Sequence, residues 1–223
     1  AYEIVDCDWS SDVCSSDLSK RHGSIKDGTT LTDTSPEEIE RKYSISLGTA
    51  FAEWKDAKVN LIDTPGFLDF QGDAIAGLTA ADGALVTVGA ATGVEAGTER
   101  MFRAAMARKD PVLFVVSMMD KDHADFDRAY RMIKERLTAK VVPVEIPIGA
   151  GAGLTGVINL FAKKAYLPAK NGKAGEYEEA EIPASERERF QKYHQEMVEA
   201  IADRKSTRLN SSHSQQSRMP SSA

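Results

Sequence analysis

The sequence has no excess of positive charge, only two cysteines and no long apolar run, and each absence excludes a class of protein. Lysine and arginine number 28 against 34 aspartates and glutamates, so charge does not indicate a DNA-binding or membrane-binding surface. No apolar run approaches the length of a membrane span, and no signal peptide is visible. Both cysteines, Cys7 and Cys14, lie close to the N-terminus.

Both ends of the chain resemble translated sequencing-adapter DNA. Residues 7–18 can be encoded by one oligonucleotide whose reverse complement, read in another frame, encodes the tail that begins at Asp203. We therefore expect the head, residues 1–18, and the tail, residues 203–223, to be artefactual and adapter-derived. The alternative is that both are natural serine-rich tails. Fold and function are predicted here from residues 19–202.

Excluding both ends changes the composition. Residues 19–202 hold no cysteine, and they retain 28 of the 34 acidic and 24 of the 28 basic residues, a net charge of about −4. The lack of cysteine excludes disulfides and thiolate metal sites and favours a cytoplasmic setting. The segment is long enough for one α/β domain with a packed core.

Apolar runs alternate with helical patterns through most of this segment. Residues 19–41 are polar and predict an ordered loop. Strands are expected at 48–54, 58–62, 83–88, 112–116 and 141–146, with a tight hairpin at 55–57, and helices at 71–81, 97–109 and 126–137. Strands that alternate with helices imply right-handed crossovers and a mostly parallel sheet.

The alternation stops at Pro147. Short strands are expected at 156–160, 164–167 and 177–182, around the Asn171-Gly172 turn signal, followed by a helix from Ser185. Ser185 and Glu188 have the spacing of a capping box, and Phe190, Tyr193, Met197 and Ile201 space out one apolar stripe. We therefore expect one α/β domain over residues 19–146 and a small α+β insert subdomain over residues 147–202.

Asp63 and Gly66 form an Asp-x-x-Gly motif directly after an apolar strand. Asp63 would stand at the carboxyl end of that strand, where ligands of open α/β sheets bind. An aspartate there can hold Mg²⁺ through water, and the Gly66 N–H can meet a terminal phosphate. An ordinary strand and turn produce the same pattern. The motif alone leaves both interpretations open.

Two further residues are candidates for nucleotide binding. Asp120 follows the strand expected at 112–116, and a carboxylate there can accept two N–H groups from the edge of guanine. Its alternative role is a cap for the next helix. Ser44, before the hairpin, could offer its hydroxyl to Mg²⁺, although an ordinary loop serine fits the pattern as well.

Several motifs occur in the order found in the GTPase domain of bacterial elongation factor G and of elongation-factor-G-like translational GTPases. They are Asp-Gly-Thr-Thr at 27–30, Glu-Glu-Ile-Glu-Arg at 37–41, Asp-Thr-Pro-Gly at 63–66, Gly-Val-Glu at 93–95 and Met-Asp-Lys at 119–121. Pro-Ile-Gly at 147–149 and Gly-Val-Ile at 156–158 resemble the insert subdomain special to elongation factor G. Residues 28–202 therefore resemble this family.

The resemblance implies a phosphate-loop GTPase fold, a mostly parallel sheet flanked by helices, in a monomeric protein of the cytoplasm. It further implies that the intact protein binds GTP or GDP with Mg²⁺, hydrolyses GTP to GDP and phosphate, and acts on the ribosome. Carried over by position, the site residues are Asp63 and Gly66 in switch II, Ser44 at the magnesium-binding threonine of switch I, and Asp120 at the guanine-reading aspartate with Ser117, Met118 and Lys121 beside it.

The sequence departs from the family pattern at three places. Ser117-Met118 replaces Asn-Lys, Lys42-Tyr43-Ser44 replaces Gly-Ile-Thr, and Phe67 replaces the histidine that orients the attacking water. The resemblance therefore leaves two functions open. One is a GTP-hydrolysing elongation factor of the translocation type, and the other is a nucleotide-gated ribosome-binding module with little or no hydrolysis.

The sequence also lacks the phosphate-cradling motif Gly-x-x-x-x-Gly-Lys-Ser/Thr and the later guanine-loop motif of the family. The phosphate-cradling motif supplies a nest of backbone N–H groups and a lysine to the nucleotide phosphates. We therefore expect this chain on its own to be inactive as a GTPase, as a fragment of an active parent.

Overall fold

The computed structural model describes residues 27–54, 56–168 and 177–216. Side chains are described as far as residue 203, Trp54 excepted. The adapter-like head, hairpin residue 55 and the expected turn at Asn171-Gly172 lie outside the described residues. Within these ranges, no helix combines the length and the apolar character that crossing a bilayer requires.

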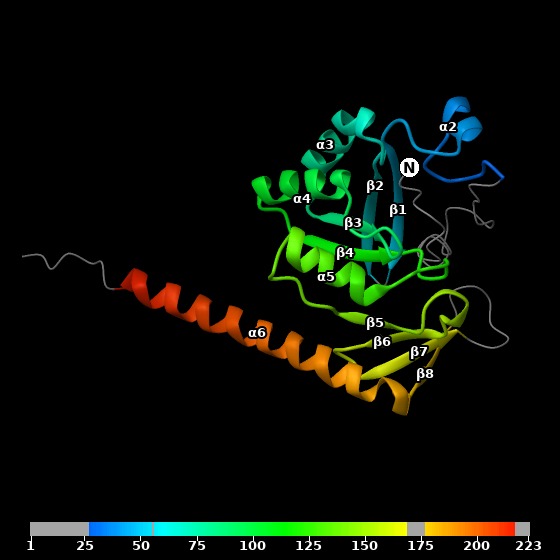
Figure 1. Ribbon diagram of the computed structural model, residues 1–223. Coiled ribbons are helices and arrows are strands. Elements are labelled where there is room, and N and C mark those ends of the chain that lie inside the picture. The colour runs from blue at the N-terminus through cyan, green and yellow to red at the C-terminus, as the bar shows by residue number, and fades with distance from the viewer. Residues whose placement is uncertain (1–26, 55, 169–176, 217–223) are drawn as a thin grey trace, which may run out of the picture.

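Within the described residues, the strands form three sheets (Figure 1). The strands are β1 (Gly48–Trp54), β2 (Ala57–Asp63), β3 (Ala84–Gly89), β4 (Val112–Ser117), β5 (Glu145–Ile148), β6 (Gly156–Asn159), β7 (Lys164–Pro168) and β8 (Tyr177–Ala180). β1 and β2 are an antiparallel hairpin, β3 and β4 are a parallel pair, and β5 to β8 form an antiparallel sheet in sequence order.

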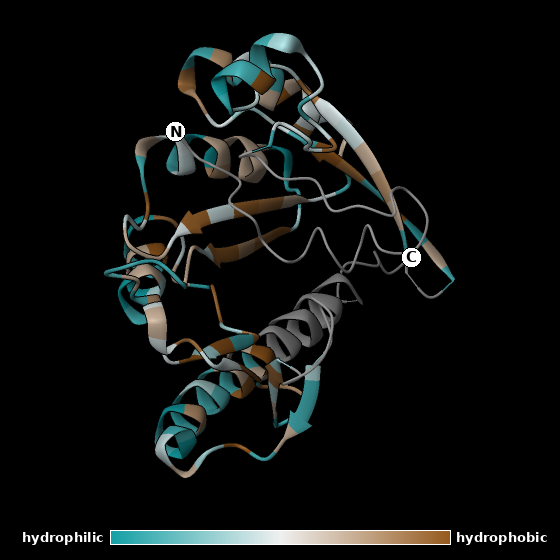
Figure 2. Ribbon diagram, turned by 90° about the vertical axis from the view of Figure 1, so that its right-hand side faces the viewer, coloured by the Kyte–Doolittle hydropathy of each residue, from teal (hydrophilic) through white to brown (hydrophobic). Residues whose placement is uncertain are grey.

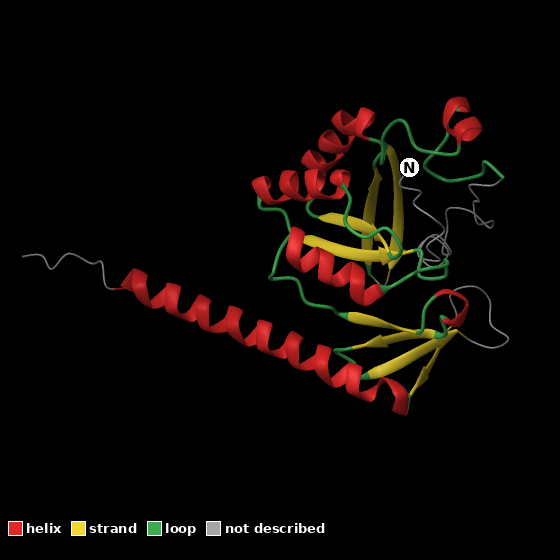
Figure 3. Ribbon diagram, viewed as in Figure 1, coloured by secondary structure: helices red, strands yellow, loops and turns green. Residues whose placement is uncertain are grey.

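Helices cover these sheets from several sides (Figure 3). They are α2 (Pro36–Arg41), α3 (Gln71–Ala80), α4 (Ala96–Arg108), α5 (Phe126–Arg136) and α6 (Arg187–Gln216), with 3₁₀ turns η1 (Leu68–Phe70), η2 (Gly151–Gly153) and η3 (Ala184–Glu186). α3 lies close against the hairpin at Gly77, where a Cβ would stand 3.1 Å from Ile62 Cγ2. In Figure 1, α6 runs past the antiparallel sheet and projects from the molecule.

The expected mostly parallel sheet is only partly present, because β3 and β4 are the single parallel pair among the described strands. The hairpin β1–β2 is a separate sheet that shares no ladder with β3. The alternation of strand and helix was predicted correctly, but that pattern does not say which strands are neighbours. Leu85 and Leu113, paired across β3 and β4, are each 51% exposed, so this face is uncovered.

The strand expected at residues 141–146 is wrong in position and in partner. Its place is taken by β5, which begins at Glu145 and pairs antiparallel with β6. Pro143 lacks the N–H that a strand ladder needs, and Val141 instead packs beside both hydrophobic clusters as a loop residue. The expected domain boundary between residues 146 and 147 falls inside β5, and the division into domains remains a prediction.

The polar segment before the hairpin contains α2, where a loop was expected. Ser35 caps this short helix, since its Oγ accepts from the Glu38 N–H at 3.2 Å and Glu38 Oε2 accepts from the Ser35 N–H at 3.1 Å. Pro36 occupies the first turn, where its missing N–H costs nothing. The Ser-x-x-Glu spacing of a capping box was present in the sequence.

Two clusters of buried side chains form the core, and α5 contributes to both. Val88 and Ile133 belong to the cluster beside the parallel pair, while Tyr130 joins the cluster between α5, the antiparallel sheet and α6. The parallel pair β3 and β4, in the middle of Figure 2, is largely brown, the colour of hydrophobic residues. Tyr193 and Met197 of α6 are buried here as expected, whereas Ile201 is 47% exposed, because α6 has by then passed the sheet.

The start of α6 also differs from the expectation. The helix begins at Arg187 after the 3₁₀ turn η3, in which the Glu186 N–H donates to the Pro183 carbonyl at 3.0 Å. The expected cap at Ser185 therefore lies inside η3.

Candidate functional site

Asp63 is the last residue of β2, and its carboxylate is turned into the protein. Thr32 Oγ1 donates to Asp63 Oδ2 at 2.6 Å, although these residues are 31 positions apart in sequence. The other oxygen, Asp63 Oδ1, is buried and has no hydrogen-bond partner among the described residues. A buried carboxylate oxygen without a donor favours a cation or a cation-bound water as its partner.

Burial raises the pKa of the Asp63 carboxyl above its ordinary value. The hydrogen bonds from the Thr32 hydroxyl and from the Thr64 backbone oppose this shift, and the negative charges of Asp33 and Glu38 add to it. All three acidic groups belong to the segment around α2 or to the end of β2. A divalent cation at Asp63 would relieve this repulsion, and the unpartnered Asp63 Oδ1 is an oxygen of the kind that Mg²⁺ binds. Within the described residues, no three histidine, cysteine or acidic side chains gather as a metal cluster, so protein ligands beyond Asp63 would have to be hydroxyls, backbone carbonyls or waters.

Glu38 organises the backbone beside Ser44. Its side chain is 4% exposed, and Oε1 accepts from the N–H groups of Ile45 and Ser46 at 2.9 and 3.0 Å. Burial alone would raise the pKa of Glu38, but these bonds and those from Ser35 outweigh it and hold the pKa below its ordinary value. The carboxylate thus fixes the turn that presents Ser44, which is half-buried.

Phe67 meets the segment that contains Ser44 through an aromatic contact. The rings of Tyr43 and Phe67 have centroids 4.7 Å apart in an edge-on arrangement, and Arg41 Nη1 donates to the Tyr43 hydroxyl at 3.1 Å. Gly66 precedes Phe67 in the turn between β2 and η1. The two expected switch segments are therefore in direct contact, through residues that replace the isoleucine and histidine of the resembled family.

The base loop, residues 117–121, connects β4 to the segment before α5. Ser117 is buried at the end of β4, and Met118 has a left-handed backbone with φ of 58°. The side chains of Asp120 and Lys121 are 65% and 56% exposed and form a loose ion pair at 3.9 Å. Asp120 is therefore accessible to a base. Its alternative role as a cap is not observed, since Asp125 caps α5 through the Arg128 N–H.

The structure joins the predicted residues into two groups. Asp63, Gly66, Phe67 and Ser44 lie on segments connected by the Thr32–Asp63 bond and the Tyr43–Phe67 contact. Within the described residues, neither a hydrogen bond nor an ion pair connects these segments to the base loop. Asp63 and Asp120 follow strands that belong to separate sheets, β1–β2 and β3–β4.

The sequence prediction missed three residues of this region: Thr32, Glu38 as a backbone acceptor, and Gly151. The capping-box spacing could have identified Glu38. Thr32 carried no local signal, because only folding brings it to Asp63. The Gly151 N–H donates to the Met119 carbonyl at 2.8 Å. No sequence signal distinguished Gly151 from the other glycines of its turn.

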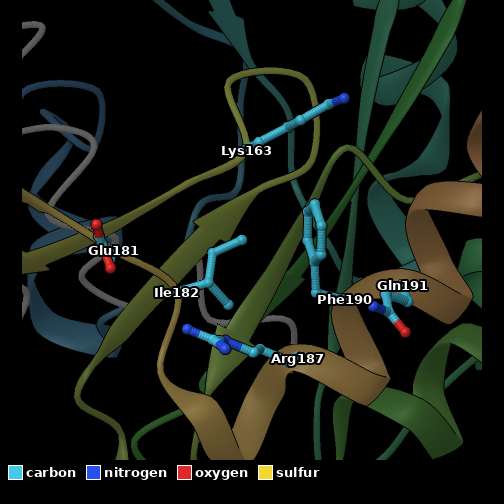
Figure 4. Close-up of a pocket in the computed structure, with 6 residues that line it drawn as sticks. All are labelled: Lys163, Glu181, Ile182, Arg187, Phe190 and Gln191. Atoms are coloured by element: carbon cyan, nitrogen blue, oxygen red, sulfur yellow. The ribbon is translucent and has the colours of Figure 1, made fainter.

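A separate hollow of about 410 Å³ lies between α6 and the end of β8. Its lining residues are Lys163, Glu181, Ile182, Arg187, Phe190 and Gln191. Figure 4 shows Ile182 and Phe190 between the cationic side chains of Lys163 and Arg187. None of the predicted site residues lines this hollow.

The fold is of the α/β class, and Asp63 stands at the carboxyl end of β2, the edge at which open α/β sheets bind their ligands. The chain matches the family model of the elongation factor Tu GTP binding domain over residues 13–207. The chain therefore belongs to this family of translational GTPase domains, and guanine nucleotide binding is a property of the family.

The fold is also similar to the crystal structure of ttk003000868 from Thermus thermophilus, with a TM-score of 0.79 and 34% sequence identity. The similarity covers 88% of this chain but 28% of that chain. This chain thus spans less than a third of the length of that relative.

Proposed function

We propose that this chain is part of a GTP-hydrolysing translation elongation factor of the translocation type, which acts on the ribosome. The observation that carries the proposal is Asp63, a buried carboxylate with one unpartnered oxygen in the Asp-x-x-Gly turn of a GTP-binding family member. GTP or GDP and Mg²⁺ are the proposed ligands, and the protein is proposed to be a cytoplasmic monomer.

Asp63 and Ser44 are the proposed holders of Mg²⁺. Oxygen ligands suit this cation, which usually retains several waters in nucleotide sites. When bound, the cation would neutralise charge on the nucleotide phosphates. Glu38 supports this role by fixing the Ile45 and Ser46 amides next to Ser44. Thr32 supports it by orienting the Asp63 carboxylate.

Asp120 is the proposed reader of guanine, with Ser117, Met118 and Lys121 forming the walls of the base site. The accessible carboxylate of Asp120 supports this role, since it can accept from two N–H groups of one base edge. Ser117 and Met118 offer fewer polar contacts than the Asn-Lys pair of the resembled family. We therefore expect this site to bind the base with lower affinity than the resembled family does, and with the same preference for guanine.

Gly66 and Phe67 are the proposed residues next to the terminal phosphate. The Gly66 N–H can donate to that phosphate, whereas a phenyl ring holds no water. The alternative function, a nucleotide-gated ribosome-binding module with little or no hydrolysis, is favoured by this one feature. The ring of Phe67 packs against Tyr43 and could keep that side of the site dry.

The test uses a longer protein in which a phosphate-loop segment stands before residue 19 in place of the adapter-like head. Ribosome cosedimentation with GTP, a nonhydrolysable analogue or GDP is combined with single-turnover hydrolysis, with and without ribosomes. Ribosome-stimulated hydrolysis supports the elongation factor. Binding that depends on nucleotide without stimulated hydrolysis supports the module, and binding insensitive to nucleotide contradicts both.

A matched pair of variants shows whether Asp63 is responsible for Mg²⁺-dependent binding of GTP. Asp63→Asn should abolish most of the Mg²⁺-dependent part of GTP affinity. Asp69→Asn, in η1, changes an exposed aspartate six residues away and should leave that affinity unchanged. Equal effects of the two substitutions would remove Asp63 from the site.

A further inference from the structure

The glycine turn, residues 149–155, reaches from the antiparallel sheet to the base loop. The Gly151 N–H donates to the Met119 carbonyl at 2.8 Å. The Lys121 carbonyl oxygen lies 3.4 Å from the place that a Cβ of Gly151 would occupy. The turn therefore contacts the backbone on both sides of Asp120.

The base loop needs such external support because its own conformation is strained. Met118 has a φ of 58°, which is uncommon for a residue with a long side chain and persists where the surroundings hold it. Inside the loop, the Lys121 N–H bonds to the Met118 carbonyl at 3.3 Å. Beyond it, the Asp125 N–H donates to the Ala90 carbonyl at 3.2 Å. The contact from Gly151 fixes the segment between these points.

The glycine turn is held in shape by close backbone approach and by its own hydrogen bonds. Gly149 has a φ of 80°, and a Cβ at this position would stand 2.0 Å from the Gly153 carbonyl oxygen. The Thr155 N–H closes the turn by donating to the Ile148 carbonyl at 2.9 Å. Ile148 itself is buried in the cluster that includes Tyr130 of α5. The turn and α5, which follows the base loop, thus share one packed core.

We infer that the glycine turn is a positioning element for guanine recognition, with Gly151 holding the loop that carries Asp120. This inference rests on the proposed function for its consequence in base selectivity. The antiparallel sheet is then part of the nucleotide site, and its movement would change base affinity through the Met119 carbonyl.

Two substitutions of the same chemical kind test the inference. Gly149→Ala puts a methyl group against the Gly153 carbonyl and must distort the turn. Gly153→Ala adds the same methyl group where nothing lies within 4 Å. Neither residue contacts the base loop directly, so a difference between the variants reports the shape of the turn.

The first measurement is amide hydrogen exchange in this chain. Gly149→Ala should increase exchange at Gly151 and across residues 119–124 by roughly tenfold, the equivalent of one lost hydrogen bond. Gly153→Ala should leave it unchanged, and exchange in β3 should stay constant in both as the check on folding. If Gly149→Ala does not fold, a Gly-Gly insertion after Gly153 loosens the turn without a steric clash.

The second measurement is nucleotide selectivity in the longer protein with a phosphate loop. Gly149→Ala should lower the ratio of GTP to ATP affinity about tenfold while the affinity for inorganic tripolyphosphate stays the same. Equal exchange in the two variants would overturn the inference, and so would faster exchange with an unchanged GTP to ATP ratio. If the unsubstituted protein binds no GTP, the proposed function fails, and the exchange result still decides whether the turn holds the loop.

Discussion

In the proposed function, Phe67 occupies the position where one side chain would decide between GTP hydrolysis and nucleotide binding without hydrolysis. Its ring lies 4.7 Å from that of Tyr43, and such edge-on pairs contribute about 0.5–1.5 kcal/mol beyond their buried area. The pair therefore stabilises contact between the two segments beside Asp63. The phenyl ring of Phe67 has no donor or acceptor with which to orient a water molecule for attack.

In the longer protein with a phosphate loop, Phe67→His should accelerate ribosome-stimulated GTP hydrolysis by about tenfold or more, since one positioning contact is typically worth on the order of a hundredfold. The measurement is single-turnover hydrolysis on ribosomes. Phe70→His, three residues along, is the control and should have no such effect. Equal rates, or a faster parent, would show that this protein positions its water by other means.

Asp120 is the residue that we expect to determine the preference for guanine. Asp120→Asn replaces a carboxylate acceptor with an amide that also donates, which suits the extra carbonyl of xanthine. In the longer protein, GTP affinity should fall and XTP affinity should rise. Competition binding with both nucleotides measures the shift. If GTP and XTP compete as before, Asp120 is not the base reader.

At the scale of elements, Glu38 links α2 to the turn at Ile45 and Ser46 through hydrogen bonds that depend on its negative charge. The helix is only six residues long, so it is stabilised chiefly by its cap and by the bonds that Glu38 accepts. The pKa of Glu38 in the folded chain lies below its ordinary value, so the stabilisation by the ionised carboxylate is fully present at any pH above that ordinary value. It is lost as the pH falls through the folded-state pKa.

Glu38→Gln should therefore lower the free energy of unfolding at neutral pH by about 1–3 kcal/mol, because hydrogen bonds to a charged group are replaced by weaker ones. The difference from the unsubstituted chain should shrink as the pH falls through the folded-state pKa. Urea unfolding at several pH values measures both effects. The neighbouring Glu37 is exposed, so Glu37→Gln is the matched control. An equal loss of unfolding free energy in both variants would contradict this role of Glu38.

The contact between α5 and α6 shows how elements distant in sequence are fastened. The Tyr130 hydroxyl donates to Glu196 Oε1 at 2.6 Å, and Tyr193 donates to Asp127. Burial and these hydrogen bonds raise the pKa of both tyrosines, so the hydroxyls remain neutral donors. This fastening joins α6 to the helix that follows the base loop.

At the scale of the whole molecule, the described residues combine the side chains of the proposed nucleotide site with a four-stranded antiparallel sheet, β5 to β8. The described residues provide side-chain candidates for Mg²⁺ and guanine, but the sequence contains no Gly-x-x-x-x-Gly-Lys-Ser/Thr motif. In such sites most phosphate contacts come from the backbone nest and lysine of that motif.

We therefore predict that this chain, made as written, binds GTP negligibly. Isothermal titration calorimetry with GTP and Mg²⁺ should give no heat of binding. The longer protein with a phosphate loop is the positive control. Micromolar binding by the chain alone would contradict the prediction and would mean that Ser44, Asp63 and Asp120 suffice.

The sequence by itself determined the local elements and the class of translational GTPase domain, whereas the more specific resemblance to elongation factor G remains a prediction. Strand and helix periods depend on neighbouring residues, so β1 to β4 and α3 to α5 were predicted within a few positions. The motif around Asp63 was likewise recognisable, because a strand followed by Asp-x-x-Gly is a local pattern. The match to the elongation factor Tu GTP binding domain family agrees with the order of these motifs.

Only the tertiary structure decided which segments meet. Thr32 reaches Asp63, Glu38 holds the Ile45 and Ser46 amides, and Gly151 supports the Met119 carbonyl. The separation of the hairpin from the parallel pair and the antiparallel pairing of β5 were decided in the same way. Such contacts depend on chain segments that pack together from far apart in sequence, and local periodicity contains no information on that choice.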